Sequence, residues 1–334
     1  MKFPTKTLMC LIASQALVAT AFAEVEPMRG KPPVPPKPQP GGTATQYIAY
    51  HGKGFTIADR GGTFLKGSKG TYKGKESEET EEVETTAPTS GIGVADVANT
   101  KAYPSRTVGL LKLKGHRCTG FLISRSIVMT AANCVYNWNT KKWYDLNGMW
   151  FSPGVHNARL SANAEPHASI QLPFQKCGVS NVFIPKNYDA LSDNSRDYAF
   201  VFLKCKVGAK TGYFGLSYNL RWQYEGRDVR TFGYPLTSVY GQDSESTVNH
   251  ETWTYETKAE IGTSDGYSGA PLQIVSAVNG CTRLQDNRSH CAVGVRSSTY
   301  TDIGGDWGSS FVRITTPIIA HALWFKKWEN YVNP

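Results

Sequence analysis

The sequence predicts an all-β fold of two six-stranded antiparallel barrels packed side by side, followed by one C-terminal α-helix. From about Val108 onward the chain consists of short runs of β-branched and aromatic residues separated by turn residues, which is typical of antiparallel strands. About 230 residues carry this pattern, which is enough for two such barrels. The one stretch in which apolar residues recur at helical spacing is at residues 315–330.

The N-terminal residues have the order of features found in a secretory signal. Two lysines precede an apolar run from Leu8 to Val18, and residues 21–23 form the small-x-small triplet AFA of a cleavage site. The apolar run is too short to span a bilayer. We therefore exclude residues 1–23 from the fold and expect a secreted protein, extracellular or periplasmic, with no membrane span.

Residues 24–95 have the composition of a disordered leader or propeptide. Residues 27–42 are rich in proline and glycine, which favours an extended spacer. Residues 76–84 contain six glutamates without apolar periodicity. We expect no packed core in this part of the chain, and we expect any processing site to lie between Glu76 and Lys101.

The barrel domain is expected to span residues 96–334, with its strands where the apolar runs lie. The clearest runs are 107–113, 120–124, 126–130, 197–204, 228–234, 253–261, 270–275, 291–295 and 309–314. At the end of the chain, Thr316 suits the N-cap of a helix and Pro317 suits its first turn. This helix is expected to dock on the β core.

The cysteines indicate disulfides rather than a metal site. Of the seven cysteines, Cys10 leaves with the signal, so an even number remains. The sequence has neither a C-x-x-C pair nor an H-E-x-x-H motif, so we expect no metal and no cofactor. The order along the chain suggests the pairs Cys118–Cys134, Cys177–Cys205 and Cys281–Cys291.

The formal net charge of +9 comes mainly from residue 101 onward. A basic surface attracts nucleic acid, anionic envelope or acidic polypeptide. The lysines and arginines there form no cluster longer than a pair, so we expect diffuse solvation and no specific nucleic-acid partner.

The motif that carries chemistry is DGYSGAP at residues 265–271. Ser268 lies between Gly266 and Gly269, and such glycines allow a sharp turn that aims the N–H groups of Gly266 and Ser268 at one point. That geometry suits a nucleophilic serine with oxyanion donors. Taken alone, the motif also fits an ordinary glycine-rich turn between strands.

Two further stretches make the chain resemble the chymotrypsin-like (trypsin-fold) serine proteases. CTGFLISRSIVMTAANC at residues 118–134 and RDYAFVFLK at residues 196–204 precede the serine motif in the family's order of base, acid and nucleophile. AYPSRTVGLL, FSPGVHN, GYFGL, TFGYP and VRIT are similar to landmarks of the bacterial glutamyl endopeptidases. The resemblance runs from about residue 92 to the end, and it implies a Cys118–Cys134 bridge, Ser268 as nucleophile and Asp197 as the orienting carboxylate.

Asn133 stands where the resemblance would place the catalytic histidine. A carboxamide has no lone pair basic enough to take the serine proton near neutral pH. His116, two residues before Cys118, is the alternative base. Tyr267 replaces the aspartate that pairs with a new N-terminus in trypsin-like members, so that activation switch is missing.

The resemblance also places Thr263 and Arg296 in the substrate-binding pocket. Arg296 replaces the histidine that helps to hold a substrate carboxylate in the glutamyl branch. Because arginine binds carboxylates bidentately, one hypothesis is a pocket for Glu or Asp side chains. The alternative is an arginine that fills or blocks the pocket or points to solvent.

These features predict a secreted, monomeric protease homologue that has lost catalysis and binds a peptide or protein ligand, acidic if the pocket hypothesis holds. The alternative is an active serine endopeptidase that cleaves after acidic residues, either through a substitute base or with Asn133 as an introduced inactivating change. A third hypothesis is attachment to envelope or matrix through the basic surface, with the proline-rich segment as a tether.

Overall fold

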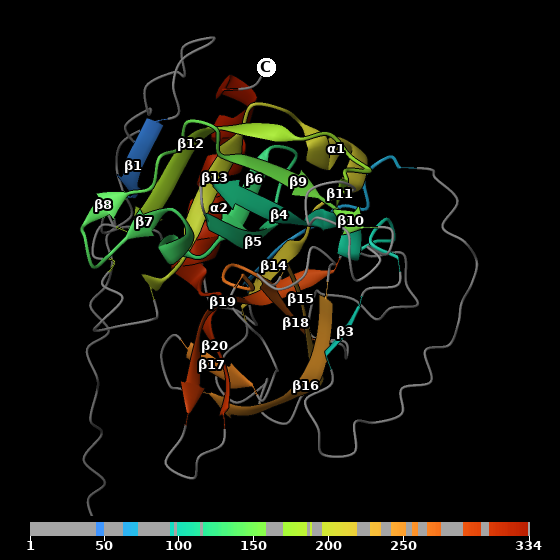
Figure 1. Cartoon of the computed structure of the whole chain (residues 1–334), viewed down its shortest axis with the longest axis vertical. Helices are drawn as coiled ribbons and strands as arrows, with labels where there is room; N and C mark the ends of the chain where they lie inside the picture. The colour runs from blue at the N-terminus through green and yellow to red at the C-terminus, as the bar shows by residue number, and fades with distance from the viewer. Residues whose placement is uncertain are drawn as a thin grey trace, which may run out of the picture.

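The fold was analysed in a computed structural model of the chain (Figure 1). The structure describes residues 45–49, 63–72, 94–96, 99–113, 116–157, 170–185, 188, 196–218, 228–234, 242–251, 256–259, 266–274, 290–301 and 307–332. All structural statements below refer to these residues.

Six described strands close the first barrel, in the upper half of Figure 1. They are β4 (Val108–Leu113), β5 (His116–Leu122), β6 (Ile127–Thr130), β9 (Trp150–Pro153), β12 (Cys177–Pro185) and β13 (Ala199–Leu203). The ring runs β12-β13-β6-β5-β4-β9 and closes through the β12–β9 pairing, with every neighbour antiparallel. One short strand, β1 (Thr45–Ala49), adds to β12 in parallel.

A second ring of six described strands lies below the first in Figure 1. Its members are β15 (Asp228–Gly233), β16 (Gln242–Glu251), β17 (Glu256–Ala259), β18 (Pro271–Ile274), β19 (Cys291–Thr301) and β20 (Trp307–Arg313). The ring runs β18-β15-β16-β17-β20-β19 and closes through the antiparallel β18–β19 pairing. The predicted all-β class with two six-stranded antiparallel barrels is therefore confirmed.

Short elements complete the described fold. They are β2 (Thr63–Leu65), β3 (Val94–Asp96), β7 (Tyr136–Asn137), β8 (Lys142–Trp143), β10 (His156–Asn157), β11 (Ile170–Gln171), β14 (Gly215–Tyr218), α1 (Val207–Thr211) and the 3-10 helices η1 (Ser105–Thr107) and η2 (Ala132–Cys134). α1 and β14 lie on the stretch of chain that leads from the first barrel to the second.

Strand β13 shows why this part of the sequence is continuously apolar. Ala199, Val201 and Leu203 belong to the core inside the first barrel, whereas Phe200 and Phe202 belong to the core between the barrels and the C-terminal helix. Side chains alternate across a strand, so both faces of β13 are buried. This strand starts two residues after Asp197 and so places that carboxylate at the end of a rigid element.

The C-terminal helix α2 (Thr316–Val332) packs against the outside of the first barrel. The Phe325 ring lies 4.6 Å from Phe183, 5.0 Å from Phe200 and 5.4 Å from Phe202, measured between centroids. Buried Glu329 accepts hydrogen bonds from the Ser124 and Ser126 hydroxyls and from the Ser126 backbone. The predicted terminal helix is present, and among the described residues no helix is long and apolar enough to cross a membrane.

Residues 63–72 differ from the expectation that the leader has no packed structure. Strand β2 pairs with β14, and Gly67 is buried against the main chain of Tyr213 and Gly215. The glycines of this stretch allow close backbone contact, because a glycine has no β-carbon to keep two chains apart. The signal segment, residues 1–23, lies outside the described residues.

Disulfides join Cys118 to Cys134 and Cys177 to Cys205, the pairs that the sequence suggests. Cys291 is also disulfide-bonded. Cys281 lies outside the described residues, so its pairing with Cys291 stays a prediction.

Candidate active site

Asn133 is held where the first barrel faces the second. It lies on η2, which follows β6 directly, and the next residue, Cys134, is bonded to Cys118 of β5. The Asn133 Oδ1 atom lies 3.4 Å from Cys134 Sγ. A short helical turn and a disulfide therefore fix the position of this side chain from both ends.

The Asn133 amide is a hydrogen-bond donor to Asp197. Its Nδ2 atom donates to Asp197 Oδ2 at 2.9 Å and to Ser297 O at 3.3 Å, and the Asn133 backbone N–H donates to Asp197 Oδ1 at 2.8 Å. The side-chain amide hydrogens and the backbone N–H of the asparagine are thus engaged, and no hydrogen bond joins Asn133 to Ser268 among the described contacts.

Asp197 is buried, with 2% of its surface exposed. Burial raises the pKa of its carboxyl group above the ordinary value, and hydrogen bonds from the Ser297 side chain and the Asn133 backbone oppose that rise. The Ser297 hydroxyl donates to Oδ2 at 2.5 Å. The carboxylate therefore has at least three donors, and it can orient a neighbour with N–H groups, which is the role that such a carboxylate plays beside a base.

Ser268 lies on a tight turn that comes from the second barrel. Gly266 and Gly269 have φ angles of +98° and +89°, which favour glycine. A β-carbon at Gly269 would collide with Thr130 Oγ1 and Thr119 O, so the turn packs directly on β5 and β6 of the first barrel. Among the described contacts, the backbone N–H groups of Gly266 and Ser268 donate to no protein acceptor.

Arg296 is the close partner of the Ser268 hydroxyl. The guanidinium Nη1 donates to Ser268 Oγ at 3.0 Å, and Oγ in turn lies 3.5 Å from Ser297 O, to which it donates. Arg296 is 3% exposed. Its backbone is fixed beside the serine turn by bonds of 2.8 Å to Ala270 O and from Gly269 N. Of the alternatives that the sequence left open for the Arg296 side chain, the one in which it points to solvent is therefore wrong.

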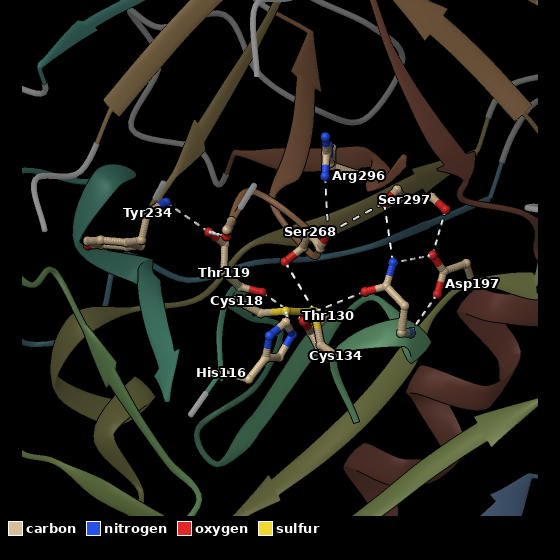
Figure 2. The surroundings of a disulfide bond; sticks show 12 residues. His116, Cys118, Thr119, Thr130, Cys134, Asp197, Tyr234, Ser268, Arg296 and Ser297 are labelled. Atoms are coloured by element: carbon tan, nitrogen blue, oxygen red, sulfur yellow. Dashed lines mark hydrogen bonds between the residues drawn. A yellow bond between two sulfur atoms is a disulfide. The ribbon is translucent and has the colours of Figure 1, made fainter. Parts of the chain in front are cut away.

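The register of β19 shifts between Arg296 and Ser298. Such a bulge re-aims the side chains next to it. Arg296 therefore reaches Ser268 while the adjacent Ser297 reaches Asp197, and Figure 2 shows the two side chains diverging from one strand.

Thr119 joins the two barrels at the site, although sequence reasoning did not single it out. Its backbone N–H donates to Ser268 O at 2.9 Å, and its hydroxyl donates to Gly266 O at 2.9 Å. The same hydroxyl accepts the backbone N–H of Tyr234 at 2.9 Å. Thr119 and Ser297 were missed because each is an ordinary strand residue, and the available signal was only adjacency to Cys118 and Arg296.

His116 is engaged away from the serine. Its ring stacks on Tyr144 with centroids 5.3 Å apart, and its Nε2 lies 3.6 Å from Cys118 Sγ. In Figure 2 the ring lies beyond the Cys118–Cys134 disulfide from Ser268. No histidine hydrogen-bonds the Ser268 hydroxyl among the described residues.

Tyr267 and Thr263 are the remaining residues that the sequence placed in or beside the site. Tyr267 is 1% exposed, and its ring lies against Gly233, where a β-carbon would collide with it. Thr263 lies outside the described residues. Within the described part of the chain, no three His, Cys, Asp or Glu side chains are grouped so that they could hold a metal ion.

The sequence model of the family described as Trypsin matches residues 94–293. The chain is 27% identical over 285 residues to the Glutamyl endopeptidase of Bacillus licheniformis, which covers 82% of this chain and 81% of that protein. It is 23% identical over 217 residues to a Bacillus subtilis protein named Extracellular metalloprotease, covering 62% of this chain and 64% of the relative.

A solved structure titled "Structure of Glu endopeptidase in complex with MPD" has a TM-score of 0.55 to this chain at 19% identity. The match covers 71% of this chain and 98% of that one. The two share a fold.

Proposed function

This chain belongs to the trypsin family, and on that premise we propose that it is a secreted serine protease homologue with impaired catalysis. Its cleft keeps the ability to bind a peptide or protein ligand. One observation carries the proposal: the side chain at the base position, Asn133, is an amide that donates to Asp197 and makes no hydrogen bond to Ser268.

Neither of the described polar neighbours of the Ser268 hydroxyl can take its proton. The guanidinium of Arg296 is protonated at all ordinary pH values and is a donor only. The backbone carbonyl of Ser297 accepts a hydrogen bond but is not a base. In subtilisin, loss of the triad histidine lowers kcat by about a million-fold, or roughly 8 kcal/mol of transition-state stabilisation. A loss of that order would reduce this cleft to a binding site.

The ligand proposed for the cleft carries an acidic side chain. Arg296 places a buried guanidinium within 3.0 Å of the serine hydroxyl. A carboxylate accepts two hydrogen bonds from a guanidinium and so competes with a single neutral hydroxyl. Binding of Glu- or Asp-containing peptides should therefore weaken strongly in Arg296→Ala, whereas equal binding by both proteins would exclude an acidic-ligand site.

The decisive experiment restores the missing base. The natural chain and Asn133→His are incubated with a serine-directed phosphonate probe and with peptides that contain Glu at the cleavage position. We expect Asn133→His to label faster by about a hundredfold or more, since the lost effect is up to about a million-fold. Ser268→Ala in both backgrounds is the control and should not label. Equal labelling and cleavage by the natural chain and the histidine variant would overturn the proposal.

The same experiment tests the second candidate function, an active endopeptidase that cleaves after acidic residues. Ser268, Asp197 and the turn N–H groups of Gly266 and Ser268, which donate to no acceptor among the described contacts, favour it, because they are what acyl transfer needs apart from a base. His116 gives it little support, since that ring stacks on Tyr144.

Secretion is proposed from the signal-like residues 1–23 and from the disulfides, which persist in oxidising compartments. The name of one relative, Extracellular metalloprotease, agrees with this location. Mass spectrometry of the protein from culture medium should give an N-terminus at Glu24 or beyond; a chain retained in the cytoplasm with Met1 intact would exclude secretion.

A further inference from the structure

Residues 63–72 lie along the segment that connects the two barrels, and we call them the strap. The first barrel ends with β13 and the second begins with β15, so residues 204–218, with α1 and β14, form the crossover between them. The strap runs antiparallel to this crossover: Thr63 pairs with Tyr218, Leu65 pairs with Leu216, and Ser68 forms a bridge with Tyr213.

Main-chain hydrogen bonds connect the strap to the crossover along its length. Ser68 N donates to Tyr213 O at 2.9 Å, and Tyr213 N donates to Ser68 O at 2.7 Å. Thr71 N and Tyr72 N both donate to Lys210 O, at 3.1 Å and 3.0 Å. This is the arrangement by which proteins capture an extended peptide at a sheet edge.

Glycines make the contact too close for other residues. A β-carbon at Gly67 would lie 2.6 Å from Tyr213 O, and one at Gly70 would collide with Lys210 O and Gly212 N. From the other side, a β-carbon at Gly212 would collide with Ser68 O. Real β-carbons do not approach other atoms this closely, so the crossover fits a strand with glycine at these two positions.

Arg106 and Tyr72 extend the contact to the first barrel. The guanidinium of Arg106 donates to Lys69 O of the strap at 2.7 Å and to Thr211 O of the crossover at 2.9 Å, and the residue is 2% exposed. The Tyr72 ring lies 5.1 Å from Phe174 and within 5.3 Å of the guanidinium, measured from its centroid. A buried cation needs its acceptors, so displacing the strap would leave Arg106 underbonded.

We propose that the crossover is a binding surface for an extended peptide, and that its occupant is the chain's own strap. The strap stays docked when the chain is cut between residues 72 and 94. Processing between Glu76 and Val94, within the range from Glu76 to Lys101 that the sequence predicts, then yields a protein of two associated pieces rather than one freed of its leader. This inference does not depend on whether Ser268 is active.

The test places a site-specific protease sequence at residues 77–83 of the full chain. After cutting, size-exclusion chromatography with intact mass measurement follows both pieces. We expect them to elute together in native buffer and at 1 M salt, because backbone bonds and aromatic contacts dominate, and to separate in denaturant. Separate elution in native buffer would overturn the proposal, and so would a species with twice the mass, since that would mean docking between copies.

A matched pair of variants checks that retention comes from the strap. Gly67→Val should release the N-terminal piece after cutting, whereas Lys66→Val, at an exposed neighbour, should retain it. Retention by both variants would mean that the strap is not what holds the piece, because β1 lies on the same piece and pairs with β12.

Hydrogen exchange on the uncut natural chain provides a measurement that needs no variant. The amides of Ser68, Thr71 and Tyr72 should exchange at least about a hundredfold more slowly than in an unstructured peptide, as bonded amides do. Exchange at the unstructured rate would overturn the proposal.

Discussion

Asn133 and Ser268 lie in one site, yet each is bonded to a different neighbour. The amide hydrogens of Asn133 go to Asp197 and Ser297 O, and the hydroxyl of Ser268 receives the guanidinium of Arg296. Under the function proposed above, two of the described residues account for the impaired catalysis. Asn133 removes the proton acceptor, and Arg296 occupies a lone pair of the nucleophile.

Arg296 should accordingly limit any activity that a restored base provides. We expect Asn133→His/Arg296→Ala to react with a phosphonate probe about tenfold or more faster than Asn133→His alone. The reason is that a hydrogen bond from a charged donor is worth about 1.5–3 kcal/mol, and the nucleophile must lose it to react. The measurement is the second-order rate constant of labelling.

Arg313→Ala in the Asn133→His background is the control for removing a buried arginine from the second barrel, and it should leave the rate unchanged. Equal rates for the Arg296 double variant and the single variant would show that Arg296 does not restrain Ser268.

At the residue scale the sequence pointed to neighbouring residues but not to their hydrogen bonds. Asn133 donates to Asp197, and both Asn133 and Ser268 donate to Ser297 O, while their catalytic roles stay predictions. The direction of the Arg296 side chain could not be predicted, because it depends on a register shift in β19 that no sequence pattern marks. Ser297 acquires its contact with Asp197 from the same shift.

At the element scale, α2 is fixed to the first barrel by a buried carboxylate. Glu329 accepts bonds from Ser124 and Ser126 at the β5–β6 connection. Glu329→Ala should lower the free energy of unfolding by about 2 kcal/mol or more, because it leaves buried donors without their acceptor. Urea denaturation measures this, with Lys327→Ala on the exposed side of the same helix expected within about 0.5 kcal/mol of the natural chain. If Glu329→Ala lowered the free energy of unfolding no more than Lys327→Ala does, Glu329 would not be the residue that fixes α2 to the first barrel.

The start of β19 should make the fold sensitive to acid. Burial, together with the nearby charges of Lys69 and Arg230, lowers the pKa of His290 from 6.5 to about 4. The folded state thus binds this proton less readily than the unfolded state, so the contribution of His290 is complete above pH 6.5 and is lost as pH falls toward 4. Between pH 7 and pH 4.5 the loss amounts to about 2 kcal/mol.

The variant His290→Asn isolates that effect. Urea unfolding at pH 7 and pH 4.5 should show a smaller acid loss in the variant than in the natural chain, because all other titrating groups are common to both. Equal pH dependence of the two unfolding free energies would rule out His290 as the source.

The sequence predicted the strands and helices whose side chains are buried, such as β13 and α2. A continuous apolar run reflects a strand that is buried on both faces, and helical spacing reflects a helix that packs on one face. The strap was not predictable in the same way. Its order comes from main-chain bonds and from glycines that permit close approach, and these leave a composition indistinguishable from that of a flexible segment.

For the whole molecule, the site depends on how the two barrels meet. Thr119 of the first barrel bonds to the Ser268 turn and to Tyr234 of the second. Thr119→Val should cost about 2–3 kcal/mol of unfolding free energy, because a buried donor and a buried acceptor lose their partner together. Urea denaturation checks this, and Thr119→Ser, which keeps the hydroxyl, should recover most of the loss. A valine variant as stable as the serine variant would mean that the hydroxyl does not join the barrels.

The disulfide beside Asn133 has a practical consequence for recombinant production. Cys134 is joined to Cys118 and lies one residue from the asparagine, so the disulfide fixes the position of Asn133 only after the two cysteines are oxidised. Chains synthesised in the reducing cytoplasm of an expression host would lack this disulfide. Assays on such preparations would underestimate both the affinity for a ligand and any activity of the Asn133→His variant. Export to the periplasm of the host, or refolding with a thiol–disulfide buffer, is the preparation on which comparisons between variants should be made.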